Sequence, residues 1–181
     1  VLSIKEDPYN TYEHLLELRK QYKVRTLFFF LFSEYTTFDK NVSTTNNRYK
    51  LLVKSVIDYA PFGQLFSYYT MSNAKKLNKE INRFENIVNM PINKSRQHYN
   101  RFEVPKTYQN LIDIGVTEDY SMGYYTHSGF RASTCTPFYF YDLDYEIKTP
   151  LLIYPFVVND DTLQKQQLTK KEALLKIKAL I

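Results

Sequence analysis

The chain has 181 residues, of which 44% are hydrophobic and 17% aromatic, and its formal net charge is +5. This length is sufficient for one domain with a buried core. The lysines are dispersed, with no block of five or more like charges, which argues against a nucleic-acid groove. The one cysteine, Cys135, excludes an intrachain disulfide and any multi-cysteine metal site.

No apolar run reaches the roughly 18 residues that a membrane-spanning helix requires. No signal peptide is visible, and nothing indicates an oxidising compartment, so the sequence favours the cytoplasm without deciding the location. Because the chain begins at Val1 rather than at a methionine, we expect a piece of a longer protein.

Helical and strand-like patterns alternate along the chain. In order, we predict a helix over 10–22, a strand over 24–32, a helix over 46–59, a strand over 62–68, a helix over 72–89, a short strand before Ser95, a helix over 105–115, strands over 116–124, 138–143 and 151–158, and a final helix from Thr169. Only 1–4 offers a strand before the first helix. The alternation, with a period of roughly 30 residues, predicts right-handed βαβ units around a parallel sheet or barrel.

Two polar segments directly follow apolar runs. They are Ser95-Arg96-Gln97-His98-Tyr99 and Gly129-Phe130-Arg131-Ala132. In sheets of βα units, residues just past the carboxyl ends of the strands line the ligand site. We therefore predict that Arg96, His98, Tyr99 and Arg131 converge on one cleft. The alternative is a surface cluster of Arg and His beside an ordinary turn.

A series of motifs then resembles a known family. The motifs are Asp7-Pro8-Tyr9-Asn10-Thr11, Phe28-Phe29-Phe30-Leu31, Phe38-Asp39-Lys40-Asn41, Ser95-Arg96-Gln97-His98-Tyr99, Asp119-Tyr120-Ser121-Met122-Gly123-Tyr124, Gly129-Phe130-Arg131-Ala132 and Pro137-Phe138-Tyr139-Phe140-Tyr141-Asp142. In this order they resemble polysaccharide deacetylase-like proteins of the NodB-homology type, in a branch common in Bacteroidetes. The resemblance implies a distorted (β/α) barrel and metal-dependent removal of acetyl groups from N-acetylated sugars. It also implies that the chain, 1–181, is a single partial barrel domain that lacks the first strand.

The same resemblance implies that the metal site is degenerate in this chain. The family's Asp-Asp pair belongs to the missing first strand. Phe66 stands where the family places a metal-binding histidine, and no histidine lies near 153–160, where a late one is expected. The three histidines of the chain show no ligand spacing. We therefore predict no metal site within the chain, and a zinc-type divalent metal only if its ligands lie outside it.

The candidate site residues fall into two groups. Arg96, His98 and Arg131 are the candidate catalytic residues, and Tyr99, Phe130 and Asp119 are the candidate substrate contacts. A guanidinium can fork onto a carboxylate or onto sugar oxygens, and flat rings stack on sugar faces. The alternatives are structural ion pairs for the arginines and plain packing for the rings. The pair Asp160-Asp161 lies in a run that is typical of a turn.

Taken together, these residues lead to one functional hypothesis and one alternative. The hypothesis is a polysaccharide deacetylase-like protein that acts on or binds an N-acetylated oligo- or polysaccharide, in exopolysaccharide metabolism. If active, it would be a hydrolase of non-peptide carbon–nitrogen bonds. The alternative is a non-catalytic glycan-binding domain, or a polysaccharide-assembly partner, of the same fold.

Overall fold

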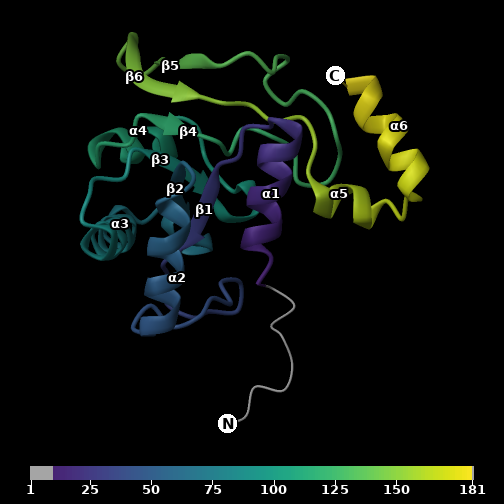
Figure 1. Ribbon diagram of the computed structural model, residues 1–181. Helices are drawn as coiled ribbons and strands as arrows, with labels where there is room; N and C mark the ends of the chain where they lie inside the picture. The colour runs from purple at the N-terminus through teal and green to yellow at the C-terminus, as the bar shows by residue number, and fades with distance from the viewer. Residues whose placement is uncertain (1–9, 181) are drawn as a thin grey trace.

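The computed structural model describes residues 10–180, in which helices and strands alternate around one six-stranded sheet (Figure 1). The predicted strand at 1–4 lies outside the described residues. In chain order the elements are α1 (Tyr12–Tyr22), β1 (Phe28–Leu31), α2 (Asn47–Ile57), β2 (Phe62–Phe66), η1 (Tyr68–Thr70), α3 (Ala74–Val88), β3 (Lys94–Gln97), η2 (His98–Asn100), α4 (Lys106–Asp113), β4 (Glu118–Asp119), β5 (Phe138–Asp142), β6 (Ile147–Ile153), α5 (Asp160–Lys165) and α6 (Lys170–Leu180).

The sheet is mixed, with the strand order β1-β2-β3-β4-β6-β5. Strands β1, β2, β3, β4 and β6 are parallel to their neighbours, and β5 is antiparallel to β6. Parallel neighbours need crossover connections, which α2, α3 and α4 supply. The predicted βα alternation is therefore confirmed, and the β5–β6 hairpin adds an antiparallel edge. A closed barrel and a missing first strand stay predictions.

Several predicted boundaries are wrong. The run 159–162, expected to form a turn, instead begins α5, because the Asn159 side chain accepts a hydrogen bond from the Asp161 N–H and caps the helix. Helix α1 begins at Tyr12, and Thr11 at its N-cap position makes no side-chain cap. The predicted strand at 116–124 shortens to Glu118–Asp119. By contrast, the capping box of the last helix is confirmed by the hydrogen bonds between Thr169 and Glu172.

The hydrophobic core lies between one face of the sheet and helices α2, α3 and α4. Helix α3 buries Leu77, Ile81, Phe84 and Val88 at the three- and four-residue spacing seen in the sequence. Phe84 stacks on Phe32 just past the end of β1, with ring centroids 4.5 Å apart. Each fully buried side chain of this size stabilises the fold by about 1.5–3 kcal/mol.

The opposite face of the sheet is only partly buried and carries both apolar and charged side chains. Successive side chains of a strand point to opposite faces, so Leu65 and Arg96, which are register partners on β2 and β3, share this face. Lys94 and Glu118 form an ion pair across it at 2.6 Å. This face leads directly into the cavity described below. Among residues 10–180, no helix is both long and apolar enough to cross a membrane.

Candidate functional site

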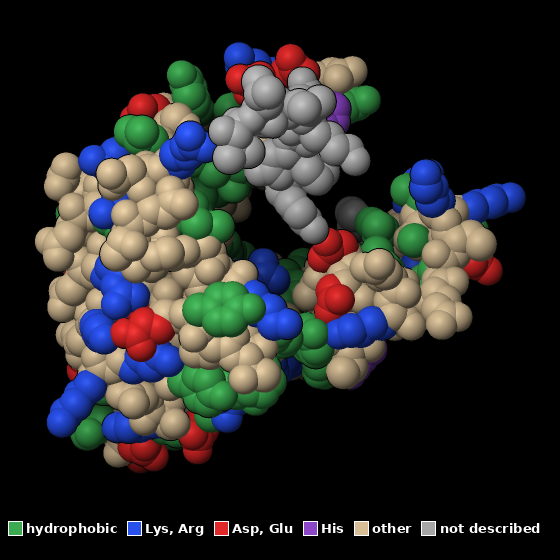
Figure 2. Space-filling model, turned by 90° about the horizontal axis from the view of Figure 1, so that it is seen from below, with side chains coloured by type: hydrophobic (Ala, Val, Ile, Leu, Met, Phe, Trp, Pro, Cys, Tyr) green, Lys and Arg blue, Asp and Glu red, His purple; other side chains and the backbone are tan. Residues whose placement is uncertain are grey.

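A cavity of about 800 Å³ opens at the carboxyl ends of the parallel strands. Residues 96–100, from the end of β3 through η2, form one wall. Phe29 and Leu65 from β1 and β2 line it on the sheet side, and Tyr125 and 159–161 line it on the other. We call this the strand-end cavity. The loop after β1 lies at the bottom of Figure 1, and Figure 2, viewed from below, shows hydrophobic, basic and acidic side chains around a hollow at this end.

The strand β3 positions two of the predicted site residues. Arg96 belongs to β3 and His98 directly follows its last residue, and both line the cavity. The chain then turns sharply, because Tyr99 and Asn100 adopt left-handed backbone conformations with φ of 59° and 51°. For a non-glycine residue this conformation costs about 1–2 kcal/mol. Such local strain is concentrated at functional sites in proteins.

The ring of His98 is held by a buried carboxylate. Its Nδ1 lies 2.8 Å from Oδ1 of Asp39, which is fully buried in the loop after β1. Asp39 is itself fixed, since it accepts hydrogen bonds from the Tyr68 N–H and the Thr36 hydroxyl. Nε2 of His98 makes no hydrogen bond with residues 10–180. A carboxylate that orients an imidazole in this way prepares the other ring nitrogen to exchange a proton with a ligand.

Arg96, which lines the cavity, lies near the charged residue Asp119 of β4. Asp119 is fully buried and accepts hydrogen bonds from the Ser95 and Ser121 hydroxyls and from the Ser121 N–H. Burial raises the pKa of Asp119 to about 6, although these hydrogen bonds and the nearby Arg96 oppose the shift. Burial also lowers the pKa of Arg96, and the nearby carboxylates of Asp119 and Asp160 oppose this shift.

The Arg96 guanidinium is not neutralised by a close partner. Its central carbon lies 4.7 Å above the ring of Phe156, a cation–π contact. No carboxylate of residues 10–180 lies within ion-pairing distance of it. Its forked N–H donors therefore remain available to a ligand in the cavity.

Two side-chain amides are buried behind the cavity wall. Nε2 of Gln97 and Nδ2 of Asn100 are inaccessible to solvent and have no hydrogen-bond partner among the described residues. Both residues line the cavity. An unsatisfied buried donor costs about 1–3 kcal/mol, so unsatisfied buried groups are rare. Because neither nitrogen is accessible to solvent, both lie behind the cavity surface and are not exposed to a ligand in this structure.

The C-terminal wall of the cavity contributes acceptors. Asp160 and Asp161 occupy the first turn of α5, and Asp161 pairs with Lys165 at 2.7 Å. The Lys165 ammonium also lies 3.8 Å from the centre of the Tyr125 ring. Carboxylates on this wall therefore face the donors on the β3 side, an arrangement that suits a ligand with both donor and acceptor groups such as hydroxyls.

The structure thus brings some of the predicted site residues together and leaves others apart. Arg96, His98 and Tyr99 line the cavity, whereas Asp119 is fully buried on β4 and is not among the lining residues. Arg131 does not line it; its guanidinium donates to the Gly123 carbonyl at 3.1 Å and packs over the Phe102 ring at 4.3 Å. Phe130 is partly exposed and is also not among the lining residues. A direct substrate role for Arg131 and Phe130 stays a prediction.

The side chains in the cavity do not match the donor set of a zinc site. Leu65, not Phe66, reaches the cavity from β2, because Phe66 is fully buried on the helix side of the sheet. Nδ1 of His98 is already engaged by Asp39. Within residues 10–180, no three His, Cys, Asp or Glu side chains are grouped so that they could hold a metal ion. A zinc site needs about three protein ligands.

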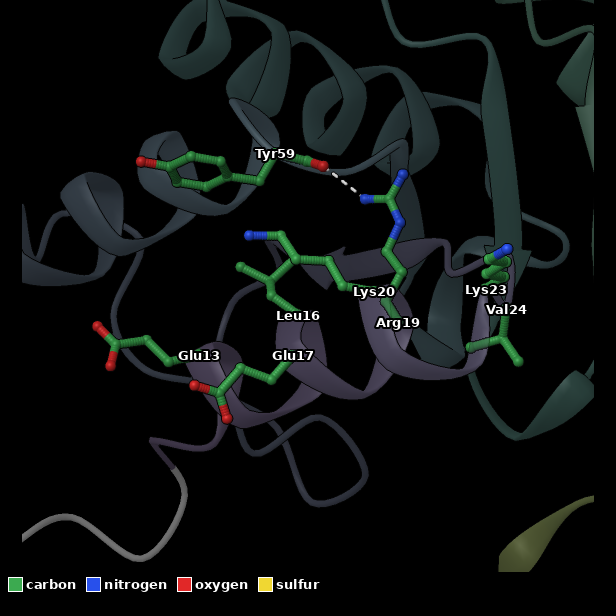
Figure 3. Close-up of a pocket in the computed structure, with 8 residues that line it drawn as sticks. All are labelled: Glu13, Leu16, Glu17, Arg19, Lys20, Lys23, Val24 and Tyr59. Atoms are coloured by element: carbon green, nitrogen blue, oxygen red, sulfur yellow. Dashed lines mark hydrogen bonds between the residues drawn. The ribbon is translucent and has the colours of Figure 1, made fainter.

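A second cavity, of about 770 Å³, lies between α1 and the end of α2 (Figure 3). Its lining is mostly long charged side chains of α1, among them Glu13, Glu17 and Lys20. Arg19 crosses it to donate a hydrogen bond to the Tyr59 carbonyl. None of its lining side chains has a buried unsatisfied polar atom. Flexible surface charges without such a group make a weaker ligand site than the strand-end cavity.

Comparisons with known proteins agree with this fold. No protein-family model matches the sequence, and no curated protein matches it. The structure is similar to that of a candidate polysaccharide deacetylase from Mycobacterium smegmatis, with a TM-score of 0.56 and 14% sequence identity. The match covers 82% of this chain but only 46% of that protein, so the chain spans less than half of its length. IcaB from Ammonifex degensii matches with a TM-score of 0.44 and 12% identity over 64% of this chain and 56% of that one.

The chain therefore has a mixed α/β fold similar to that of a polysaccharide deacetylase-type structure. This likeness concerns the fold alone, because one fold hosts many activities. The superfamily that the motifs resemble and its Bacteroidetes branch both stay predictions.

The sequence interpretation missed the residues that support the site. Asp39 was taken only as part of a loop motif, although it holds His98. Gln97 and Asn100, on either side of His98 and Tyr99, were not singled out as donors. The available signal was position, because both amides belong to the segment that directly follows an apolar run. Their burial depends on contacts with distant segments and leaves no pattern in the sequence.

Proposed function

We propose that the protein binds an N-acetylated oligo- or polysaccharide in the strand-end cavity and acts on it as a polysaccharide deacetylase-like protein. One observation carries this proposal. The cavity brings the guanidinium of Arg96, whose N–H donors have no ion-pair partner among residues 10–180, next to the ring of His98, which Asp39 holds through Nδ1. An acetamido carbonyl and the hydroxyls of a sugar are the acceptors that such donors require.

The likeness to a deacetylase-type fold supports the same substrate class. In parallel α/β sheets, ligands bind outside the carboxyl ends of the strands, where this cavity lies. His98 would contribute proton transfer, because Asp39 fixes its ring and leaves Nε2 for the ligand. In this proposal the chain is one partial barrel domain, and the reaction is hydrolysis of a carbon–nitrogen bond in exopolysaccharide metabolism.

A second candidate function is binding without catalysis. The apolar side chain of Leu65 lines the cavity from β2, and the described residues contain no group of three His, Cys, Asp or Glu side chains that could hold a metal ion. These observations favour a glycan-binding domain or a polysaccharide-assembly partner of the same fold. The two candidates share the ligand and differ in turnover.

Binding and turnover are measured separately. Calorimetric titration with the β-1,4-linked tetramer of N-acetylglucosamine should detect binding by the wild type. We expect Arg96→Ala to weaken binding by about 10- to 100-fold, because hydrogen bonds to charged groups contribute about 1.5–3 kcal/mol. The matched control is Lys148→Ala, since Lys148 also packs over an aromatic ring, Tyr139, but lies on the β5–β6 hairpin.

Acetate release from the same tetramer decides between the two candidates. Release by the wild type that is lost in His98→Gln, with binding retained, supports the hydrolase. Binding without acetate release supports the non-catalytic domain. Equal binding by the wild type and by a folded Arg96→Ala protein would contradict the assignment of the site.

A further inference from the structure

Lysines that are dispersed along the sequence gather on one side of the folded chain. Two hollows, of about 320 and 520 Å³, lie along α3, and they adjoin because Lys79 and Arg83 line both. Figure 2 shows Lys and Arg side chains on the side of the molecule where α3 lies. We call the two hollows together the basic groove; its cations are Lys50, Lys75, Lys76, Lys79 and Arg83.

The charge of the groove is unbalanced. Its five cations are accompanied by two carboxyl groups, those of Glu34 and Glu80. Glu80 is buried and already accepts hydrogen bonds from the N–H and the hydroxyl of Ser67. The groove therefore keeps a positive charge even when both carboxyl groups are ionised, which suits an anionic ligand.

Glu34 marks a place in the groove where a carboxylate is bound. Its Oε1 lies 2.5 Å from the Lys79 ammonium and 3.6 Å from the Arg83 guanidinium. The side chains of Glu34 and Lys79 are 59% and 62% exposed, so water screens this pair and makes it weak. A carboxylate of another molecule could therefore replace Glu34 at little cost.

Neutral groups hold two of the cations in place. The Arg83 guanidinium donates a hydrogen bond of 3.2 Å to the carbonyl of Phe32, just past the end of β1. The Lys76 ammonium lies 4.9 Å from the centre of the Tyr69 ring. Both charges are thus positioned before a ligand arrives, which reduces the entropy that binding would have to remove.

Three cations form a row along α3. Lys75, Lys79 and Arg83 are four residues apart, so they lie on one face of the helix with about 6 Å between them along its axis. Like charges at this spacing oppose helix formation, and a bound anion would offset that cost. In an extended peptide, every second side chain points the same way, about 6.6–6.8 Å apart. A segment with a carboxylate at every second position would therefore match the row.

The remaining lining residues favour a peptide over other anionic macromolecules. Asn82, Asn86 and Thr44 offer amides and a hydroxyl that can bond to a peptide backbone. Within residues 10–180, no lining residue is aromatic, whereas single-stranded nucleic acids bind by stacking their bases on rings. Ile87 is the one apolar lining residue in the same range, which is too little for insertion into a membrane surface.

We propose that the basic groove binds an extended acidic segment of a partner protein, whose carboxylates at alternate positions pair with Lys75, Lys79 and Arg83. This inference goes beyond the proposed function and does not depend on it. Within the described part of the chain, the groove shares no lining residue with the strand-end cavity.

The first test compares two peptides of the same composition and charge. GEGEGEG carries its carboxylates at alternate positions, and GGEEEGG carries them side by side. Both are capped, labelled with the same dye and titrated with the wild type by fluorescence anisotropy in low salt. We expect GEGEGEG to bind at least about twofold more tightly than GGEEEGG, and its binding to weaken when salt is raised to about 0.5 M.

A pair of charge-matched variants locates the binding site. Lys75→Gln combined with Lys79→Gln should weaken GEGEGEG binding by about three- to tenfold, because two exposed ion pairs are lost. The control combines Lys170→Gln with Lys171→Gln, which removes the same charge from exposed positions on α6. Circular dichroism checks that both proteins fold.

Glu34 allows a test in the opposite direction. Glu34→Gln removes the carboxylate that competes for Lys79 and Arg83, so we expect GEGEGEG to bind about two- to fivefold more tightly. Glu17→Gln, at an exposed position on α1, makes the same change in net charge and should have a much smaller effect.

Three results would overturn the inference. Equal affinity for the two peptides contradicts the match in spacing. A double lysine variant of α3 that binds GEGEGEG as tightly as the α6 control contradicts the site. Competition by the trimer of galacturonic acid at the same concentration as unlabelled GEGEGEG would assign the groove to an acidic glycan and not to a protein segment. Since glycan binding in the strand-end cavity is measured separately, none of these results decides the proposed function.

Discussion

Two regions of this molecule expose several tyrosines, and they differ in what surrounds the rings. The β5–β6 hairpin, at the top of Figure 1, exposes Tyr139, Tyr141 and Tyr145 by 48%, 50% and 69%. Near the carboxyl ends of β1, β2 and β3, Phe38, Tyr69 and Tyr99 expose 37%, 44% and 37% of their surface. On the hairpin, Lys148 over Tyr139 is the one cation–π contact found within the described residues.

At the strand ends, the rings pack on one another around a cavity that contains buried polar groups. Asp39 fixes His98 there, and Gln97 and Asn100 keep unsatisfied donors. An exposed aromatic ring is common and costs little free energy of folding. A buried hydrogen-bond donor without a partner, or a tyrosine in the left-handed backbone region, makes folding less favourable. The abundance of tyrosine therefore does not mark the site; the strand ends differ from the hairpin in the cavity beside their rings and in the His98 ring that the buried Asp39 holds.

The largest expected effect concerns Asp119, which is fully buried on β4. Its pKa rises from 3.8 in the unfolded chain to about 6 in the fold, so the folded state holds the proton more tightly. The contribution of Asp119 to stability is therefore greatest below pH 4 and is lost as pH rises to about 6, by about 3 kcal/mol in total.

Comparison with Asp119→Asn isolates this contribution. The free energy of unfolding of the wild type minus that of the variant, measured by urea denaturation, should fall between pH 4 and 6 and level off above pH 6. A difference that is constant from pH 4 to 7 would contradict the burial-driven shift.

The next effect concerns the packing behind Arg96. A Cβ on Gly123 would lie 2.3 Å from the Phe156 ring. The Arg96 guanidinium packs over the same ring, so a shift of Phe156 would also move Arg96. We expect Gly123→Ala to destabilise the fold by about 1–3 kcal/mol through overpacking and to weaken glycan binding. Thermal unfolding and calorimetry measure the two effects. Tyr141→Ala on the hairpin is the control, and a Gly123→Ala protein as stable as this control would argue against the packing.

A smaller effect is expected at Asp39. Asp39→Asn removes the charge from the bond to His98 and retains an acceptor, so we expect a loss of about 1 kcal/mol in stability. The informative readout is the tautomer of His98, followed by NMR of the imidazole nitrogens, which should change from one dominant form to a mixture. An unchanged tautomer would show that Asp39 does not orient the ring. Asp142→Asn, which alters a buried aspartate below the hairpin, serves as the control.

The smallest effect is expected at the tip of the hairpin. Tyr145 is largely exposed and has no aromatic or cation–π contact within the described residues. Tyr145→Ala should change the free energy of unfolding by less than about 0.5 kcal/mol and leave glycan binding unchanged. A loss of binding in this variant would erase the distinction between the two regions.

The sequence by itself determined the order and type of most elements. The α3 stripe and the Thr169–Glu172 capping box are local patterns, and local patterns depend only on residues a few positions apart. The position of Arg96, His98 and Tyr99 at one strand end followed from the same reasoning, because parallel strands share an edge. The helix that starts at Asp160 was missed, because Asn159 serves a turn or a helix cap equally well.

Only the tertiary structure decided which of these residues contact one another and how much free energy their burial costs. It placed Asp39 against His98 across 59 positions of sequence, buried the amides of Gln97 and Asn100, and directed Arg131 to Phe102 and away from the cavity lining. It also put Leu65 on the cavity and Phe66 in the core, since strand alternation depends on a register that composition does not fix. Burial and long-range pairing result from packing between segments that are distant in the sequence. The free-energy cost of burying polar groups at this site has the same origin.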